Sequence, residues 1–130
     1  MNIISFYTNT LKYSTQNTNK IGIQQELIGV NFRYIGQVVN GLPEGKGISY
    51  YNNGERYVGD FRNGKKEGKG IEYFNNGDRY EGDYRNDKKE GKGIAYFNNG
   101  DRMMGDYYNG GEIGKHVMLT RNGEVKINNY

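Results

Sequence analysis

The sequence predicts an all-β protein, in which 23-residue hairpins build an elongated, twisted, single-layer antiparallel meander. A 23-residue unit repeats along the chain, and its two closest copies, 57–79 and 80–102, are identical at 19 of 23 positions. Each copy alternates aromatic-rich runs with Asn-Gly and Gly-x-Gly signals, which favour hairpins. Glycine recurs too often for helices, and no 3.6-residue apolar stripe is present. Such self-similarity marks a repeat protein whose units bury apolar side chains against their neighbours.

The repeat pattern divides the chain into an N-terminal segment, the repeat array and a short C-terminal segment. Residues 1–33 fit the unit poorly, and we expect them to be a decayed repeat that is partly disordered towards its Asn- and Thr-rich start. Their apolar residues available to cover the first sheet edge are Ile21, Ile23, Leu27 and Ile28. Residues 126–130 are expected to form a terminal strand. The array itself is expected over 34–125, in units 34–56, 57–79, 80–102 and the degenerate cap 103–125.

Each unit is expected to contain two strands. An Asn-Gly pair such as Asn76-Gly77 lies between two aromatic runs, and Asn-Gly accepts the positive φ angles of a type I′ turn. With this pair at the turn centre, Tyr73 faces Tyr80 and the rings share one face with the glycines. The second connection, NGKKEGKG, is expected to be a Gly- and Lys-rich loop. On the other face, the same register predicts the cation–π pairs Tyr51–Arg56, Phe74–Arg79 and Phe97–Arg102.

This register gathers aromatic and aliphatic side chains on one face. In a single-layer sheet no second layer covers that face, and a contiguous apolar patch usually marks an interaction site. Tyrosine is also favoured at binding hot spots. In the alternative interpretation, sheet curvature packs the rings on one another and leaves little of them exposed. The candidate partner-binding residues are Tyr50, Tyr57, Tyr73, Tyr80, Tyr84, Tyr96, Ile71 and Ile94.

Three lysines of unit 57–79 also recur in unit 80–102, and we expect the sheet to align them along one rim. Such a row could contact anionic phospholipids, phosphoinositides included, with about 1 kcal/mol from each lysine near the surface. Interspersed Glu67 and Glu90 dilute this field, and lysine near sheet edges is also ordinary protection against aggregation. The candidate lipid-binding residues are Lys65, Lys66, Lys69, Lys88, Lys89 and Lys92.

Composition favours a binding module over an enzyme. The chain has no cysteine and one histidine, His116, which we interpret as a strand residue in a glycine position, so we expect no catalytic residue, cofactor or metal. The chain has a net charge of +3, and its charges alternate in sign. We therefore expect it to lack the basic face that nucleic-acid binding requires. No apolar run approaches the roughly 20 residues of a membrane helix. The expected localisation is cytoplasmic, either free or peripheral to a membrane or the cytoskeleton.

The C-terminal end is a candidate self-association site. An open meander leaves its last strand, near 124–129, with unpaired backbone groups that invite pairing. A two-fold contact between two such ends would bury the apolar last unit in a homodimer. Alternatively, these side chains fold over their own edge. The candidate dimer residues are Met103, Met104, Val117, Leu119, Val125 and Ile127.

The unit YxGxxxNGxxxGxG, followed by an aromatic strand and a closing Asn-Gly, resembles the MORN repeat (membrane occupation and recognition nexus). The resemblance covers 34–125 and is strongest over 34–102. Members of this family are mainly scaffolds and binding modules that dimerise end to end, hold a partner segment in an aromatic groove, or associate with phosphoinositide-containing membranes. The resemblance therefore implies a non-enzymatic scaffold for a protein partner, with a peripheral phospholipid-binding module as the alternative. The matching positions are Tyr34, Gly36, Gly45, Gly47, Tyr57, Gly59, Gly68, Gly70, Tyr80, Gly82, Gly91 and Gly93.

Overall fold

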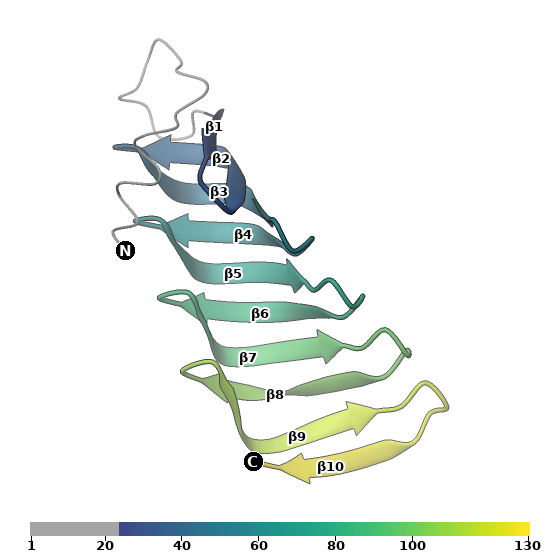
Figure 1. The fold of residues 1–130 in the computed structure, drawn as a ribbon. Helices are drawn as coiled ribbons and strands as arrows, with labels where there is room; N and C mark the ends of the chain where they lie inside the picture. The colour runs from purple at the N-terminus through teal and green to yellow at the C-terminus, as the bar shows by residue number, and fades with distance from the viewer. Residues whose placement is uncertain (1–23) are drawn as a thin grey trace.

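The computed structural model describes residues 24–130, which form one open antiparallel sheet (Figure 1). Its ten strands lie side by side in chain order, so the predicted all-β meander is confirmed. The described residues contain no helix. The strands are β1 (Gln24–Ile28), β2 (Phe32–Val39), β3 (Leu42–Tyr51), β4 (Arg56–Arg62), β5 (Lys65–Tyr73), β6 (Arg79–Arg85), β7 (Lys88–Tyr96), β8 (Arg102–Tyr108), β9 (Gly111–Leu119) and β10 (Val125–Asn129).

The first strand, β1, belongs to the segment that fits the repeat poorly. It pairs with β2, and its Leu27 lies opposite Tyr34 and is fully buried. Leu27 therefore packs into the first end of the core, where an apolar residue was expected. The expectations of partial disorder near the start, and of a role for Ile21 and Ile23, lie outside the described residues.

Two kinds of turn join the strands, and the type I′ turn does not lie at the predicted position. The two-residue loop Asn63-Gly64 has φ angles of 49° and 81°, the signature of a type I′ turn. By contrast, 74–78 is a longer loop, in which the Phe74 amide donates to the Asp78 carbonyl at 2.9 Å. Its Gly77 has a φ of 92°, as in a glycine bulge that closes a three-residue turn. The predicted type I′ turn at Asn76-Gly77 is wrong because Asn75 also enters the loop.

The extra loop residue moves the register by one. Tyr80 lies opposite Glu72, not opposite Tyr73, and Gly82 lies opposite Gly70. A slip of one residue sends side chains to the other face. Tyr73 therefore lies on the opposite face of the sheet from Tyr80. The predicted grouping of the candidate partner-binding residues on one face is wrong.

We call the face that holds the core the aromatic face. Its rings pack edge to face in a continuous ladder from Tyr34 to Tyr130, with centroids 5.0–5.6 Å apart. Each such contact adds about 0.5–1.5 kcal/mol to the burial of the rings. The ladder replaces the aliphatic core that this chain lacks. The buried residues of the hydrophobic core, most of which are rings of the ladder, are Leu27, Tyr34, Val38, Tyr57, Phe61, Tyr80, Tyr84 and Tyr107.

The leading tyrosine of each of the first three units lies across bare glycine backbone. A Cβ added at Gly70 would overlap the Tyr57 ring, and Gly93 stands in the same relation to Tyr80. The Tyr57 hydroxyl donates to the Asp60 carbonyl at 3.0 Å. Burial, reinforced by Asp60, raises the pKa of Tyr57 well above its ordinary value, so the hydroxyl remains a donor even in alkaline solution. The leading tyrosine and the second glycine of Gly-x-Gly therefore depend on each other, because the ring needs a residue without a side chain beneath it.

The segment KKEGKG, expected as a loop, is part of a strand. Between β4 and β5 the register shifts, with Gly59 opposite Gly70 but Phe61 opposite Lys66. The bulge includes Gly68, whose φ is 78°, and such bulges bend a strand; β3, β5, β7 and β9 curve near their first residues (Figure 1). Glu67, in the bulge, accepts the backbone N–H of Asn86 at 3.0 Å and so ties consecutive turns together.

The other surface, which we call the arginine face, carries alternating arginines and tyrosines on neighbouring strands. Arg56 lies over Tyr73 and Arg79 lies over Tyr96, both with 3.8 Å from the guanidinium carbon to the ring centroid. Cation–π pairing therefore occurs, but the predicted ring partners are wrong for the same reason of register. The misassigned rings are Tyr51, Phe74 and Phe97.

Candidate interaction surfaces

The predicted partner-binding residues do not form one surface. Tyr57, Tyr80 and Tyr84 lie in the ladder of the aromatic face and are at most 4% exposed. There the alternative interpretation holds, because the rings cover one another. The remaining predicted residues lie on the arginine face, where most are half-buried and Tyr50 is exposed: Tyr50, Ile71, Tyr73, Ile94 and Tyr96.

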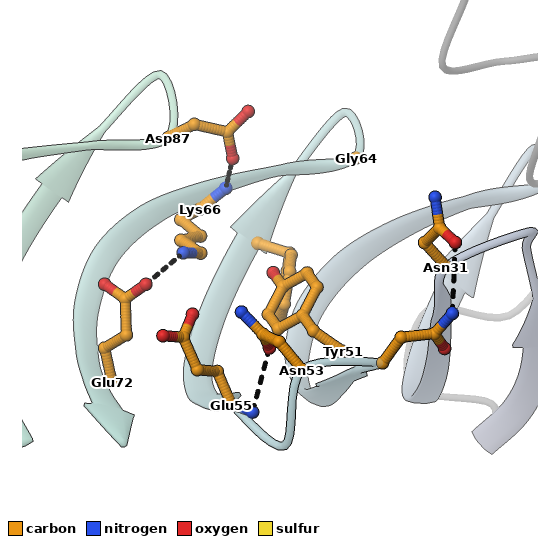
Figure 2. A pocket seen from close by; sticks show the side chains of 10 residues that line it. Asn31, Tyr51, Asn53, Glu55, Gly64, Lys66, Glu72 and Asp87 are labelled. Carbon is orange, nitrogen blue, oxygen red and sulfur yellow. Dashed lines mark hydrogen bonds and ion pairs between the residues drawn. The ribbon is translucent and has the colours of Figure 1, made fainter. Parts of the chain in front are cut away.

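Two pockets open beside the buried ladder. We call the first the Lys66 pocket; it has a volume of about 570 Å³ and includes Tyr51, Phe61 and Glu72 in its lining (Figure 2). We call the second the Lys89 pocket; it has about 300 Å³. Its lining includes Phe74, Lys89, Ala95, Phe97, Met103, Tyr107 and Glu112. The half-buried rings Tyr51, Phe74 and Phe97 recur once per unit. They were not predicted as binding residues, because the predicted register put them on the face opposite the candidate tyrosines.

Lys66 forms a half-buried polar network. Its ammonium group lies 2.9 Å from one Glu72 oxygen, and the Tyr84 hydroxyl donates to the other at 2.7 Å. The side chains of Lys66 and Glu72 are only 13% and 16% exposed, and their pairing offsets the cost of removing each charge from water. Asp87 accepts the Lys66 backbone N–H at 2.8 Å, as Figure 2 shows. Burial, followed by the charge of Glu72, raises the pKa of Tyr84 far above its ordinary range.

Lys89 occupies the equivalent place one unit later. Its ammonium nitrogen lies 4.5 Å from the Tyr80 ring centroid and 5.5 Å from those of Phe74 and Tyr107. Where the preceding unit has Glu72, this unit has Ala95. Among residues 24–130, no carboxylate forms an ion pair with Lys89.

The six predicted lipid-binding lysines do not share one rim. Lys66 and Lys89 lie on the aromatic face, whereas Lys69 is 80% exposed on the arginine face and pairs with Asp83 at 2.6 Å. Lys92 is 90% exposed there and lies 3.5 Å from Asp106. Lys65 and Lys88 are exposed at the first positions of β5 and β7. The prediction of a single rim is wrong because strand alternation distributes residues that were assigned to a loop.

His116 lies inside the core. Its side chain is fully buried, stacks against Tyr107 and Tyr130, and lies over Gly105. Its Nε2 is 2.9 Å from the Asp106 carbonyl oxygen, so this nitrogen carries the proton. The contacts are those of a packing residue.

The C-terminal end exposes an apolar patch on the arginine face. Met104 lies opposite Val117, and Val117 lies opposite Ile127 on the last strand. Met104 and Ile127 are 45% and 54% exposed. Met103, also predicted for the dimer, is instead buried on the aromatic face, beside the Lys89 pocket. We call the following residues the C-terminal patch: Met104, Val117, Leu119, Val125 and Ile127.

Two kinds of site are absent from residues 24–130. No three side chains of His, Cys, Asp or Glu lie close enough to hold a metal ion. The same residues include no helix long and apolar enough to span a membrane.

A sheet made of one repeated hairpin, with a tyrosine laid over paired glycines, defines a β-hairpin repeat protein. The MORN repeat family matches residues 34–56, 57–79 and 80–102, more than half of the chain, and the protein belongs to this family. The resemblance seen in the sequence is thereby confirmed for these three units. MORN repeats indicate a protein-interaction or membrane-associated module. A comparison with curated proteins gives no match.

Proposed function

We propose that this protein is a non-enzymatic scaffold that binds a protein partner on the aromatic face, over the Lys66 and Lys89 pockets. The observation that carries the proposal is the row of half-buried rings Tyr51, Phe74 and Phe97 beside these pockets. Tyr51 and Phe74 pack against the buried ladder. Rings held in place before binding lose little conformational entropy, which favours their use as anchors.

The division of the lysines supports a protein ligand over a phospholipid surface. A membrane can contact only one face of a single-layer sheet at a time. On the arginine face, Asp83 and Asp106 partly neutralise Lys69 and Lys92. On the aromatic face, Glu72 neutralises Lys66. Each face therefore presents a weaker positive field than six aligned lysines would, and anionic phospholipid binding is the alternative that the experiment below must exclude.

The test is photo-crosslinking in cell lysate with benzoylphenylalanine placed at Phe97 or, as the control, at Lys92. Phe97 lines the Lys89 pocket, whereas Lys92 is exposed on the arginine face. We expect a discrete protein adduct from position 97 and none from position 92, as measured by mass spectrometry. Adducts from position 92 alone, or only phospholipid adducts from position 97, would contradict the proposal.

We also propose that two copies associate through their C-terminal ends. The C-terminal patch is exposed beside β10, whose outer edge has no strand partner among residues 24–130, and pairing would bury both. We expect light scattering to give twice the mass of one chain, and the double substitution Val125→Glu and Ile127→Glu to give monomers. Val30→Glu is the matched control, because Val30 is 74% exposed near the other end. A wild-type monomer at all concentrations would mean that the end is capped by its own side chains.

A further inference from the structure

The two most similar units differ mainly around one lysine. Units 57–79 and 80–102 differ at four positions: Val58/Glu81, Phe61/Tyr84, Gly64/Asp87 and Glu72/Ala95. At three of them the polar member reaches Lys66 or its partner: Glu72 pairs with the ammonium group, Tyr84 donates to Glu72, and Asp87 accepts the backbone N–H. Three of the four differences between the two units therefore supply polar groups around Lys66.

The same comparison leaves the surroundings of Lys89 incomplete. Ala95 stands in place of Glu72, and Gly110 stands in place of Asp87. Three aromatic rings still surround the ammonium group and hold it at the pocket, where water is partly excluded. Glu55 and Asp78 also line the pocket, but neither forms an ion pair with Lys89. A half-buried cation without an ion-pair partner attracts an anion more strongly than an exposed one does.

We propose that the Lys89 pocket binds an acidic side chain, Asp or Glu, of the protein partner, in the position that Glu72 occupies beside Lys66. This inference rests on the proposed function and adds the chemistry of the ligand. The Lys66 pocket is the model for this interaction. There the carboxylate of Glu72 pairs with Lys66, the equivalent lysine of the preceding unit, among equivalent rings. Residues 1–23 contain no Asp or Glu, so that segment cannot supply the carboxylate.

Glu112 lies at the same pocket and opposes an incoming carboxylate. It occupies the lysine position of the following unit and lines the pocket with Tyr107. Burial raises the pKa of Tyr107 to about 12, and the second contribution comes from the negative charge of Glu112. Its removal should therefore strengthen carboxylate binding, by about two- to fivefold.

The experiment is an NMR titration of the full chain with the capped peptide acetyl-Gly-Glu-Gly-amide, followed at the lysine side chains. We expect a saturable shift at Lys89, no comparable shift at Lys92, and no response to the matching glutamine peptide. Glu112→Gln should lower the dissociation constant by the factor given above. Ala95→Glu should abolish the response, because its carboxylate would take the ligand's place. This variant is expected to fold, since Glu72 is accommodated at the equivalent position.

Equal shifts at Lys89 and Lys92 would mean non-specific screening and would overturn the inference, as would peptide binding that survives Ala95→Glu. Phosphatidylserine vesicles form a second arm: a response of Lys89 to vesicles but not to the peptide would assign the pocket to lipid and overturn it too. Failure of the peptide while the adduct at position 97 still forms would remove only this inference. Absence of the adduct would remove the proposed function itself.

Discussion

Replacement of Tyr80 by alanine is expected to destabilise the protein by about 3–5 kcal/mol, the usual cost of deleting a large buried ring. Tyr80 is 1% exposed, stacks edge to face on Tyr84 and Tyr107, and covers Gly93. Its loss opens the ladder in the middle of the sheet. Tyr50→Ala is the matched control, because Tyr50 is 38% exposed on the arginine face and loses mainly one cation–π contact with Arg33, worth about 1 kcal/mol or less.

Urea unfolding followed by far-ultraviolet circular dichroism measures both variants. A domain of this size is stable by only about 5–15 kcal/mol, so the Tyr80 substitution should remove a large part of the total. Because each unit contacts only its neighbours, the break should also uncouple the two halves and broaden the transition. Equal losses for the two substitutions would mean that the aromatic ladder is not the core.

The sequence was sufficient to predict the repeat and the antiparallel meander, but not where each strand begins or which residues share a face. Asn53-Gly54 and Asn63-Gly64 are the same dipeptide, yet only the second forms a two-residue turn. The first lies in a longer loop, where Tyr51 donates its backbone N–H to the Glu55 carbonyl at 2.9 Å. The dipeptide encodes a turn but not the length of its loop. A difference of one loop residue then reverses the two faces.

The candidate site depended on that same register. Shifted by one residue, Glu72 and Tyr84 fall on opposite faces, and the network around Lys66 cannot be seen. The signal that could have revealed it was the short list of differences between two nearly identical units. Glu72 and Tyr84 both lie at positions where the two units differ, and the two residues are in contact. Positions that change together between repeats therefore indicate residues that touch each other.

In the last unit, the packing of a tyrosine on a glycine is replaced by the packing of a histidine, which comes from the opposite strand of the pair, on a glycine. In the central units, Tyr57 on β4 lies over Gly70, and its hydroxyl donates to the Asp60 carbonyl. The last unit has Met103 in the tyrosine position and His116 in the glycine position. The imidazole lies over Gly105, and its Nε2 donates to the Asp106 carbonyl, which holds the same place in the unit as that of Asp60. The two departures from the repeat therefore compensate for each other.

Met103→Tyr and His116→Gly are consequently expected to be harmful singly and nearly neutral together. The new tyrosine alone would compete with the imidazole for the space over Gly105, and overpacking costs about 1–3 kcal/mol. Removal of the imidazole alone leaves a cavity in a fully buried place, at about 2–4 kcal/mol. The double variant restores the central pattern and should lie within about 1 kcal/mol of the wild type in urea unfolding, which implies a coupling of about 2 kcal/mol or more. Met104→Tyr, on the exposed arginine face, is the control and should add independently to His116→Gly. Additive losses for Met103→Tyr with His116→Gly would show that the two positions do not share one packing site.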